Sequence, residues 1–203
     1  AWTMMKRKNL FTIPVTKGQK LEGLITTTDI ATSYMDVYDS HILAEANTQY
    51  QNIVNTMDGE LITGDPQGYF SKGKVVVAAS SPEMMETFIE EGDLVILGNR
   101  YEVQLCAIEL NVSCIIVCRG VKISRTIKKL AEDRNIVVIS TPHDTFSASR
   151  LINQSIPVKH FMETEGLTVF HTNDYVEEIR HDIAKQKTRD FPVLDKKGNY
   201  YGL

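Results

Sequence analysis

Between residues 74 and 153, short apolar runs alternate with segments of helical spacing, and no other part of the chain is patterned so regularly. Continuous apolar runs of this kind are typical of strands that are buried on both faces. Because helical segments separate the runs, the region predicts a parallel sheet covered by helices. The predicted strands are Val75–Ala79, Leu94–Leu97, Val112–Val117 and Ile136–Ile139.

Polar residues that follow these runs indicate where the intervening helices begin. Ser80 or Ser81 is expected to cap the first helix, and Thr141 or Asp144 the last. Two further helices are predicted over about 100–110 and 124–134, and the last helix over about 143–153. Ahead of the sheet, residues 47–74 predict a short helix, Tyr50–Met57, and a short strand, Glu60–Thr63.

The two ends of the chain have a different pattern, with short strands joined by glycine turns. The first end predicts a helix tail ending near Asn9, two strands and a helix from about Asp29 to Ala46; the strands are Phe11–Val15 and Leu21–Ile25. The last end predicts a strand, a helix capped by Asn173 or Asp174, and two more strands. The strands are Leu167–His171, Phe191–Asp195 and one beginning at Tyr200.

These two ends resemble each other, which indicates an internal repeat. Each has an amphipathic helix, a strand with a Pro-Val pair, a Lys/Gly turn and a second strand with a glycine; the glycines are Gly23 and Gly202. A supersecondary unit used twice usually pairs with its copy to bury its apolar face. The α/β region between the copies is therefore predicted to be an insertion into a two-repeat module. Both chain ends are expected to cut through structural elements of a longer polypeptide.

Composition excludes several other classes of protein. The chain has 203 residues, 42% of them apolar, and a formal net charge of -4, which does not suggest nucleic acid or an anionic membrane as the main partner. No apolar run approaches the roughly 18 residues that span a bilayer, and the charged first residues, with no apolar run after them, do not have the pattern expected of a signal peptide. Cys106, Cys114 and Cys118 are expected to be buried thiols in a reducing cytoplasm.

The segment Gly23–Asp29 carries the most specific chemistry in the sequence. A carboxylate such as Asp29 can accept hydrogen bonds from both hydroxyls of a ribose, and threonine hydroxyls beside a helix start suit a phosphate. The alternative is that Thr26 or Thr28 only caps the helix while Asp29 complements its dipole. The repeat and the complete motif favour nucleotide binding.

A helix, a Pro-Val strand, a turn and then Gly-Leu-Ile-Thr-Thr-Thr-Asp resemble the CBS repeats of cystathionine β-synthase. In that family two repeats form a Bateman module that binds adenine nucleotides. The resemblance implies that Asp29 holds the ribose, that Thr26 contacts phosphate and that the backbone around Ile13 and Pro14 meets the adenine. In the second copy, Thr172 and the segment Asp190–Pro192 take the matching adenine-side positions.

Other polar and aromatic residues near these positions complete the predicted site. Tyr200 and Phe191 can stack on a purine, although strand packing explains them equally well. Arg189 can meet phosphate, and His171 adjoins Thr172. The predicted nucleotide-binding residues are Ile13, Pro14, Thr26, Thr28, Asp29, His171, Thr172, Arg189, Asp190, Phe191, Pro192 and Tyr200. No catalytic or metal-binding residues are predicted.

The inserted region resembles the DRTGG domain, through Gly98-Asn99-Arg100 and Cys118-Arg119-Gly120. The first motif has Asn99 where the family has Asp, and the second replaces Thr-Gly-Gly. A DRTGG domain between two CBS repeats resembles the regulatory region of clostridial family II inorganic pyrophosphatases. The resemblance implies inhibition by AMP and ADP and activation by ATP or diadenosine polyphosphates. Manganese or cobalt is expected only in catalytic domains outside this chain.

The predicted fold class is therefore α/β, with two CBS repeats in a Bateman module and an inserted DRTGG-like domain. The boundaries are 1–46 for the first repeat, 47–155 for the inserted domain and 156–203 for the second repeat. The expected function is nucleotide-dependent regulation by a cytoplasmic homodimer, with no catalysis in this chain. Two alternatives stay open: a ligand-free dimerisation scaffold, or an enzyme whose site lies at the strand ends near Arg100, Arg119 and His143.

Overall fold

The computed structural model describes residues 1–35, 39–186 and 190–203. The chain forms two compact units, one of residues 1–36 with 158–203 and the other of residues 37–157. The chain therefore leaves one unit, builds the other and returns to complete the first. The first division falls ten residues before the predicted boundary at 46, and the second falls two residues after the predicted boundary at 155. Within the described residues, no helix is both long and apolar enough to cross a membrane.

The second unit is built on a five-stranded sheet in the order β4-β9-β8-β7-β6. The four predicted apolar runs pair in parallel, so the predicted parallel sheet is confirmed. β4 pairs antiparallel with β9 at one edge, a position that the sequence pattern did not predict. The strands are β4 (Glu60–Thr63), β6 (Val75–Ala78), β7 (Leu94–Leu97), β8 (Cys114–Val117) and β9 (Val137–Ser140).

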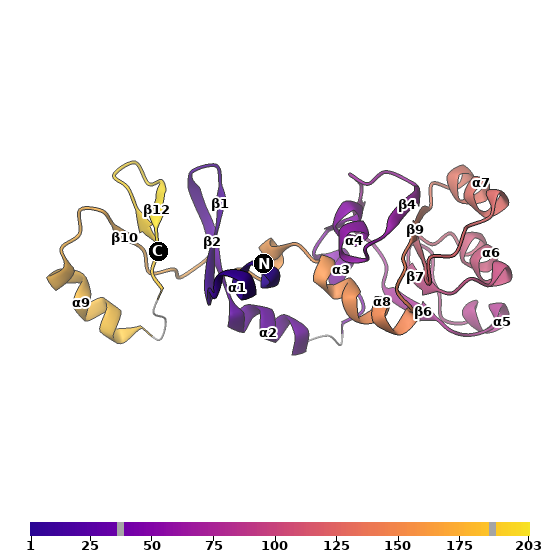
Figure 1. The fold of residues 1–203 in the computed structure, drawn as a ribbon, viewed down its shortest axis with the longest axis horizontal. Coiled ribbons are helices and arrows are strands. Elements are labelled where there is room, and N and C mark those ends of the chain that lie inside the picture. Colours follow the sequence, from indigo (N-terminus) through magenta and orange to yellow (C-terminus); the bar gives the residue numbers. More distant parts are fainter. Residues whose placement is uncertain (36–38, 187–189) are drawn as a thin grey trace. The chain divides into compact units, whose positions relative to one another are not determined.

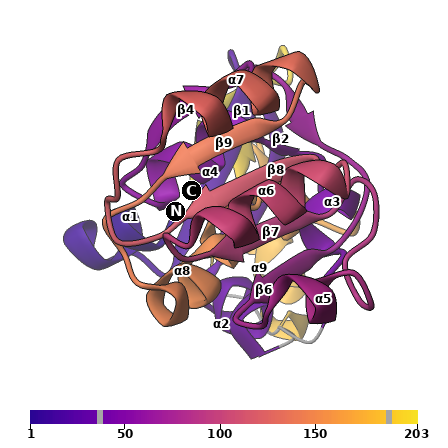
Figure 2. The ribbon, with the colours of Figure 1, turned by 90° about the vertical axis from the view of Figure 1, so that its right-hand side faces the viewer.

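Helices cover both faces of this sheet. The helices α5 (Pro82–Met85), α6 (Tyr101–Glu109) and α7 (Arg125–Asp133) lie on one face (Figure 2). The helices α4 (Tyr50–Thr56) and α8 (Thr145–Leu151) lie on the other, with α3 (Ile42–Glu45) and the 3-10 helix η1 (Ile152–Ser155) (Figure 1). Ser124 caps α7 and Asp144 caps α8 through their side chains. A two-stranded pair, β3 (Thr48–Gln49) and β5 (Tyr69–Phe70), completes the unit.

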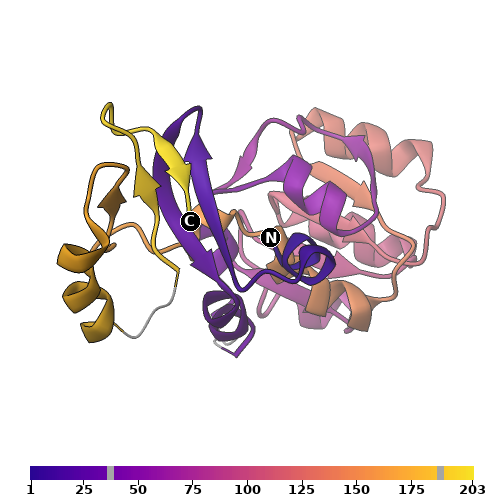
Figure 3. The same ribbon diagram turned by 60° about the vertical axis from the view of Figure 1, so that its left-hand side comes forward.

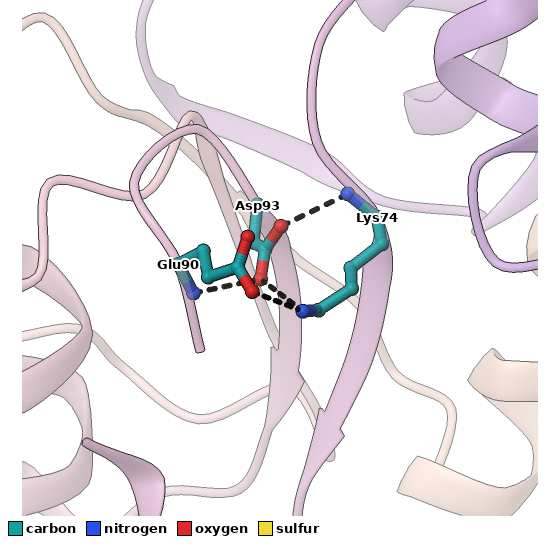
Figure 4. Close-up of polar contacts among 3 residues, drawn as sticks. All are labelled: Lys74, Glu90 and Asp93. Carbon is teal, nitrogen blue, oxygen red and sulfur yellow. Dashed lines mark hydrogen bonds and ion pairs between the residues drawn. The ribbon is translucent and has the colours of Figure 1, made fainter. Parts of the chain in front are cut away.

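One buried carboxylate fastens the loops at the amino ends of the parallel strands. Asp93 is only 1% exposed and accepts hydrogen bonds from the backbone N–H groups of Lys74 and Glu90, each at 2.9 Å. Figure 4 shows the Lys74 ammonium beside the same carboxylate, with Nζ 4.0 Å from Oδ2. The buried charge is thus paired and hydrogen-bonded, as a buried carboxylate must be to be tolerated.

The first segment of the other unit follows the predicted order of helix, strand, strand and helix. Its elements are α1 (Trp2–Lys8), β1 (Thr12–Lys17), β2 (Lys20–Thr26) and α2 (Thr27–Met35). Asn9 ends α1 in the left-handed conformation. The strands form an antiparallel hairpin around Gly18, which has a positive φ of 61° as the turn requires.

The prediction of one helix from Asp29 to Ala46 is wrong. Helix α2 ends at Met35, and the next helix, α3, begins only at Ile42. The Asp39 carboxylate accepts the backbone N–H of His41 at 2.8 Å, which forms a local turn that competes with helix. The division between the two units also falls here. Residues 36–38 of the predicted helix lie outside the described residues.

The last segment has the three predicted strands, and the first two are shorter than predicted. The strand expected over Leu167–His171 is only β10 (Phe170–His171), because β10 pairs with β11 (Val193–Leu194) at two positions. β11 pairs antiparallel with β12 (Tyr200–Gly202). Figure 3 shows this small sheet beside the β1–β2 hairpin, where the backbone N–H of Tyr200 donates to the carbonyl of Gln19 at 2.7 Å.

The helix between β10 and β11, α9 (Val176–Lys185), differs from expectation in its cap and its packing. Tyr175 occupies the N-cap position, so the prediction of Asn173 or Asp174 is wrong. The Asp174 carboxylate instead accepts the backbone N–H of His171 at 2.7 Å. The apolar residues of α9 have no buried member within this chain, and Val176 is 70% exposed.

Candidate functional site

Thr26 and Asp29 form a reciprocal hydrogen-bonded pair where β2 ends and α2 begins. The backbone N–H and the hydroxyl of Thr26 donate to Oδ2 of Asp29, at 2.6 Å and 2.8 Å. In return, the Asp29 N–H donates to the Thr26 hydroxyl oxygen at 3.2 Å. This is the geometry of a capping box, with Thr26 as N-cap. Both side chains are half-buried, and Thr28, directly before Asp29, is exposed.

The predicted adenine-side residues of the first repeat lie on the strand beside this pair. In the β1–β2 ladder, Thr12 faces Thr26, Ile13 faces Ile25 and Pro14 faces Leu24. Ile13 and Pro14 are half-buried, and Ile13 packs against the small core of this unit. The ladder therefore brings residues 12–14 and the Thr26–Asp29 pair, which are separate in sequence, to neighbouring strands.

A hydrogen bond between the two repeats joins this group to Asp190, and the sequence pattern did not reveal it. The Thr12 hydroxyl donates to Oδ2 of Asp190 at 2.5 Å across 178 residues of sequence. Thr12 is 9% exposed, whereas Asp190 is half-buried. Thr12 and Asp190 occupy equivalent places two residues before the proline of each repeat, which was the available signal. The hydrogen bond joins Thr12 to Asp190, and the β1–β2 ladder sets Thr12 opposite Thr26, which is hydrogen-bonded to Asp29.

The other predicted residues of the second repeat are placed around β11. Pro192 is buried, and its carbonyl accepts the N–H of Phe170 at 3.0 Å. The Phe191 ring packs on Phe170 with centroids 5.3 Å apart, so it is engaged in packing within the repeat. Burial raises the pKa of the Tyr200 hydroxyl above its usual value.

His171 and Thr172 lie at the far end of the β10–β11 pair from Asp190. The Thr172 N–H donates to the carbonyl of Leu194 at 2.9 Å, and both side chains are exposed. None of the described contacts joins these two residues to the Thr26–Asp29 pair. Arg189, also predicted as a phosphate contact, lies outside the described residues.

The carboxyl ends of the parallel strands hold the residues of the alternative enzymatic hypothesis, and their polar groups are used within the fold. The His143 ring lies 3.1 Å from Oδ2 of Asp58, and its carbonyl accepts the Arg119 N–H at 2.8 Å. The Arg100 guanidinium donates to the carbonyl of Ser80 at 2.5 Å. The parallel strands are ordered β6 to β9 without reversal, so the sheet lacks the switch point at which such folds form a ligand crevice.

The three cysteines and the acidic residues are the remaining groups with chemistry for reaction or metal binding. Cys106, Cys114 and Cys118 are free thiols, and their predicted burial is confirmed. This burial raises the pKa of each thiol above its usual value. Raised values keep thiols protonated and unreactive. Among the residues that the structure describes, no group of three or more His, Cys, Asp or Glu side chains could hold a metal ion.

Fold and site together define the class: two CBS-type repeats that flank an α/β domain in sequence, with a Thr/Asp pair at the end of a strand of the first repeat. Residues 52–155, which include β4 to β9, match the family model of the DRTGG domain. The chain belongs to the DRTGG domain family.

A solved structure supports both parts of this class. The chain matches the CBS and DRTGG domains of the regulatory region of Clostridium perfringens pyrophosphatase, crystallised with its activator diadenosine tetraphosphate. The identity is 42%, the TM-score is 0.94, and the match covers 99% of this chain and 88% of that one. The predicted combination of CBS repeats with an inserted DRTGG domain is confirmed.

Curated relatives are longer proteins. The cobalt-dependent inorganic pyrophosphatase of Clostridium perfringens is 42% identical over the whole of this chain, which covers 37% of that protein. A probable manganese-dependent inorganic pyrophosphatase of Thermotoga maritima is 27% identical over 98% of this chain, covering 36% of its length. The Bacillus subtilis protein YtoI is 29% identical over 76% of this chain. The chain thus spans little more than a third of the relatives that it matches.

Proposed function

We propose that this chain is an adenine-nucleotide-binding regulatory region of an inorganic pyrophosphatase. AMP or ADP binding inhibits, and ATP or a diadenosine polyphosphate activates. Asp29 accepts the ribose hydroxyls, Thr26 and the N–H groups at the start of α2 contact phosphate, and Ile13 and Pro14 lie against the adenine. Thr28, exposed beside them, contributes a further hydroxyl.

The observation that carries this proposal is the 42% identity, over 99% of the chain, to a regulatory region that was crystallised with diadenosine tetraphosphate. The capping box does not conflict with it. One oxygen of the Asp29 carboxylate holds the Thr26 N–H and hydroxyl, and a carboxylate has lone pairs for about four hydrogen bonds. The pair therefore orders the start of α2 and keeps acceptor capacity for a ribose.

The residues around β11 form the corresponding part of a second nucleotide position. Asp190, Phe191 and Pro192 take the adenine side, with His171 and Thr172 at the strand end and Tyr200 on β12. Arg189 is proposed as a phosphate contact of this position. The hydrogen bond from Thr12 to Asp190 supports two positions that adjoin each other within one unit.

The whole protein is proposed to hydrolyse pyrophosphate with manganese or cobalt in catalytic domains outside this chain, and this chain has no catalytic role of its own. We place the protein in the cytoplasm, where its buried free thiols stay reduced. It acts as a homodimer through the CBS and DRTGG domains. Exposed apolar side chains such as Tyr175 and Val176 on the second repeat support a partner surface.

Isothermal titration calorimetry tests the proposal with AMP, ADP, ATP and diadenosine tetraphosphate on the whole chain. We expect adenine nucleotides to bind and Asp29→Ala to weaken AMP by about 10- to 100-fold, the loss of one or two charge-assisted hydrogen bonds. Asp144→Ala is the matched control, because Asp144 also caps a helix but lies in the α/β domain.

Three outcomes separate the proposal from its alternatives. Equal weakening by both variants would show that a general loss of stability, and not a contact made by Asp29, lowers the affinity. Folded protein that binds no nucleotide would favour a dimerisation scaffold. Pyrophosphate hydrolysis by this chain alone, abolished by His143→Ala, would favour an enzyme active in the α/β domain.

A further inference from the structure

The first repeat completes its small core with a residue that comes after the inserted domain. The buried members of this core are Met5, Ile25 and Met162, at 1%, 2% and 8% exposure. Met162 belongs to the return segment, defined here as Val158–Glu163, which re-enters the unit from the α/β domain. Ile25 directly precedes Thr26, so the return segment packs behind the strand that carries the candidate nucleotide site.

The return segment is also hydrogen-bonded to that strand. The Leu24 N–H donates to the carbonyl of Glu163 at 3.0 Å, and the Glu163 N–H donates to the carbonyl of Leu24 at 2.8 Å. The return segment approaches β2 so closely that a Cβ added to Gly23 would lie 2.5 Å from the Glu163 carbonyl oxygen. One edge of β2 therefore pairs with β1 and the other is held by the return segment.

Only a short connection separates this anchor from the core of the α/β domain. Ile152 and Ile156 are 1% and 7% exposed within that domain, and Met162 follows Ile156 by six residues. Six residues reach at most about 20 Å when fully extended. The actual connection has less slack, because Pro157 fixes its own φ and the 3-10 helix η2 (Val158–His160) shortens the path.

We propose that the return segment couples nucleotide binding at Gly23–Asp29 to the α/β domain. The proposal rests on the function proposed above. A ligand held by Thr26 and Asp29 restrains the end of β2, and β2 restrains Glu163 through two backbone hydrogen bonds. Met162 anchors the connection in the core of the repeat unit, and Ile156 anchors it in the α/β domain. A restraint on Met162 therefore limits the positions that Ile156 can occupy. Both domains then share part of the ordering free energy of one ligand.

An insertion tests the coupling without removing any contact. Gly-Gly-Ser placed between Pro157 and Val158 lengthens the connection and keeps both anchors. The same insertion after Gly166 is the matched control: this exposed position lies beyond Met162, so the distance between the anchors is unchanged. AMP is the probe, calorimetry reports its binding, and hydrogen–deuterium exchange with mass spectrometry reports protection in residues 152–156.

In the unmodified chain and the Gly166 control, saturating AMP should slow hydrogen exchange in residues 152–156 by about fivefold. This factor corresponds to the lower end of typical coupling free energies. The insertion after Pro157 should keep AMP affinity within about twofold and lose this slowing. Binding without any change in residues 152–156, or equal slowing in both insertions, overturns the coupling and leaves the proposed function standing. Failure of AMP to bind in calorimetry would overturn both.

Discussion

Gly23→Ala is a direct test of why the nucleotide motif contains a glycine at this position. The backbone of Gly23 is not in the left-handed region, so the substitution introduces no φ strain. The added methyl group would instead lie 2.5 Å from the Glu163 carbonyl oxygen and 3.1 Å from the Met162 side chain. The carbonyl is backbone and is fixed by its own hydrogen bond to Leu24, so either the return segment or β2 has to move.

The cost follows from the contacts that this movement breaks. Separating Leu24 from Glu163 removes two backbone hydrogen bonds, each worth about 1 kcal/mol net. Displacing Met162 from a core with few buried members adds an overpacking cost of about 1–3 kcal/mol. We expect Gly23→Ala to destabilise the repeat unit by about 3–5 kcal/mol and to weaken AMP binding with it.

Urea unfolding followed by tryptophan fluorescence measures this effect, because the only tryptophan, Trp2, lies in the repeat unit. Gly202→Ala is the matched control. Gly202 is the counterpart of Gly23 in the second repeat, and a Cβ there would meet no atom within 4 Å. Its substitution should change stability by less than about 0.5 kcal/mol. Similar losses in the two variants would refute the explanation based on the return segment.

Three further predictions concern the α/β domain. Thr48→Val should stabilise it by about 1 kcal/mol in thermal unfolding, because the fully buried Thr48 hydroxyl has no hydrogen-bond partner among the described residues; destabilisation would show an unseen partner. Asp93→Ala should destabilise it by about 3 kcal/mol in urea, since it leaves the Lys74 and Glu90 N–H groups unpaired, and a loss below about 1 kcal/mol would contradict this account. Asp144→Ala should lower the melting temperature at pH 7. Hydrogen bonding from the Ser147 N–H holds the pKa of Asp144 below its usual value, so its stabilisation is present above about pH 4 and is lost as pH falls through the folded value. A difference in melting temperature that does not shrink as the pH falls below about 4 would exclude this cause.

The α/β domain was predictable because its signals are local. Each parallel strand is an apolar run, each helix follows within a few residues, and caps such as Ser124 and Asp144 stand where the patterns change. The antiparallel edge strand β4 was predicted as a strand but not placed, because its partner β9 lies far along the chain. The prediction of one long helix from Asp29 was wrong for a similar reason. The chain passes from one unit to the other between α2 and α3, and helical spacing in the sequence does not reveal such a change of domain.

The candidate site was predictable only in part. The Gly23–Asp29 motif identified Thr26 and Asp29, and the structure brings them together through hydrogen bonds. The role of Thr12 was not predicted, because a threonine in a strand has no distinctive sequence pattern and its hydrogen-bond partner Asp190 lies in the other repeat. Nothing in the sequence around Glu163 indicates its contact with Leu24, because backbone hydrogen bonds depend on the path of the chain rather than on the side chain.

A crystal structure of this chain grown with saturating AMP tests the central claim most directly. The account predicts the ribose hydroxyls within about 3 Å of the Asp29 carboxylate, the phosphate at the start of α2 and the purine beside Ile13 and Pro14. AMP bound instead at the carboxyl ends of the parallel strands, near Arg119, would contradict the account and return the α/β domain to consideration as the ligand-binding part.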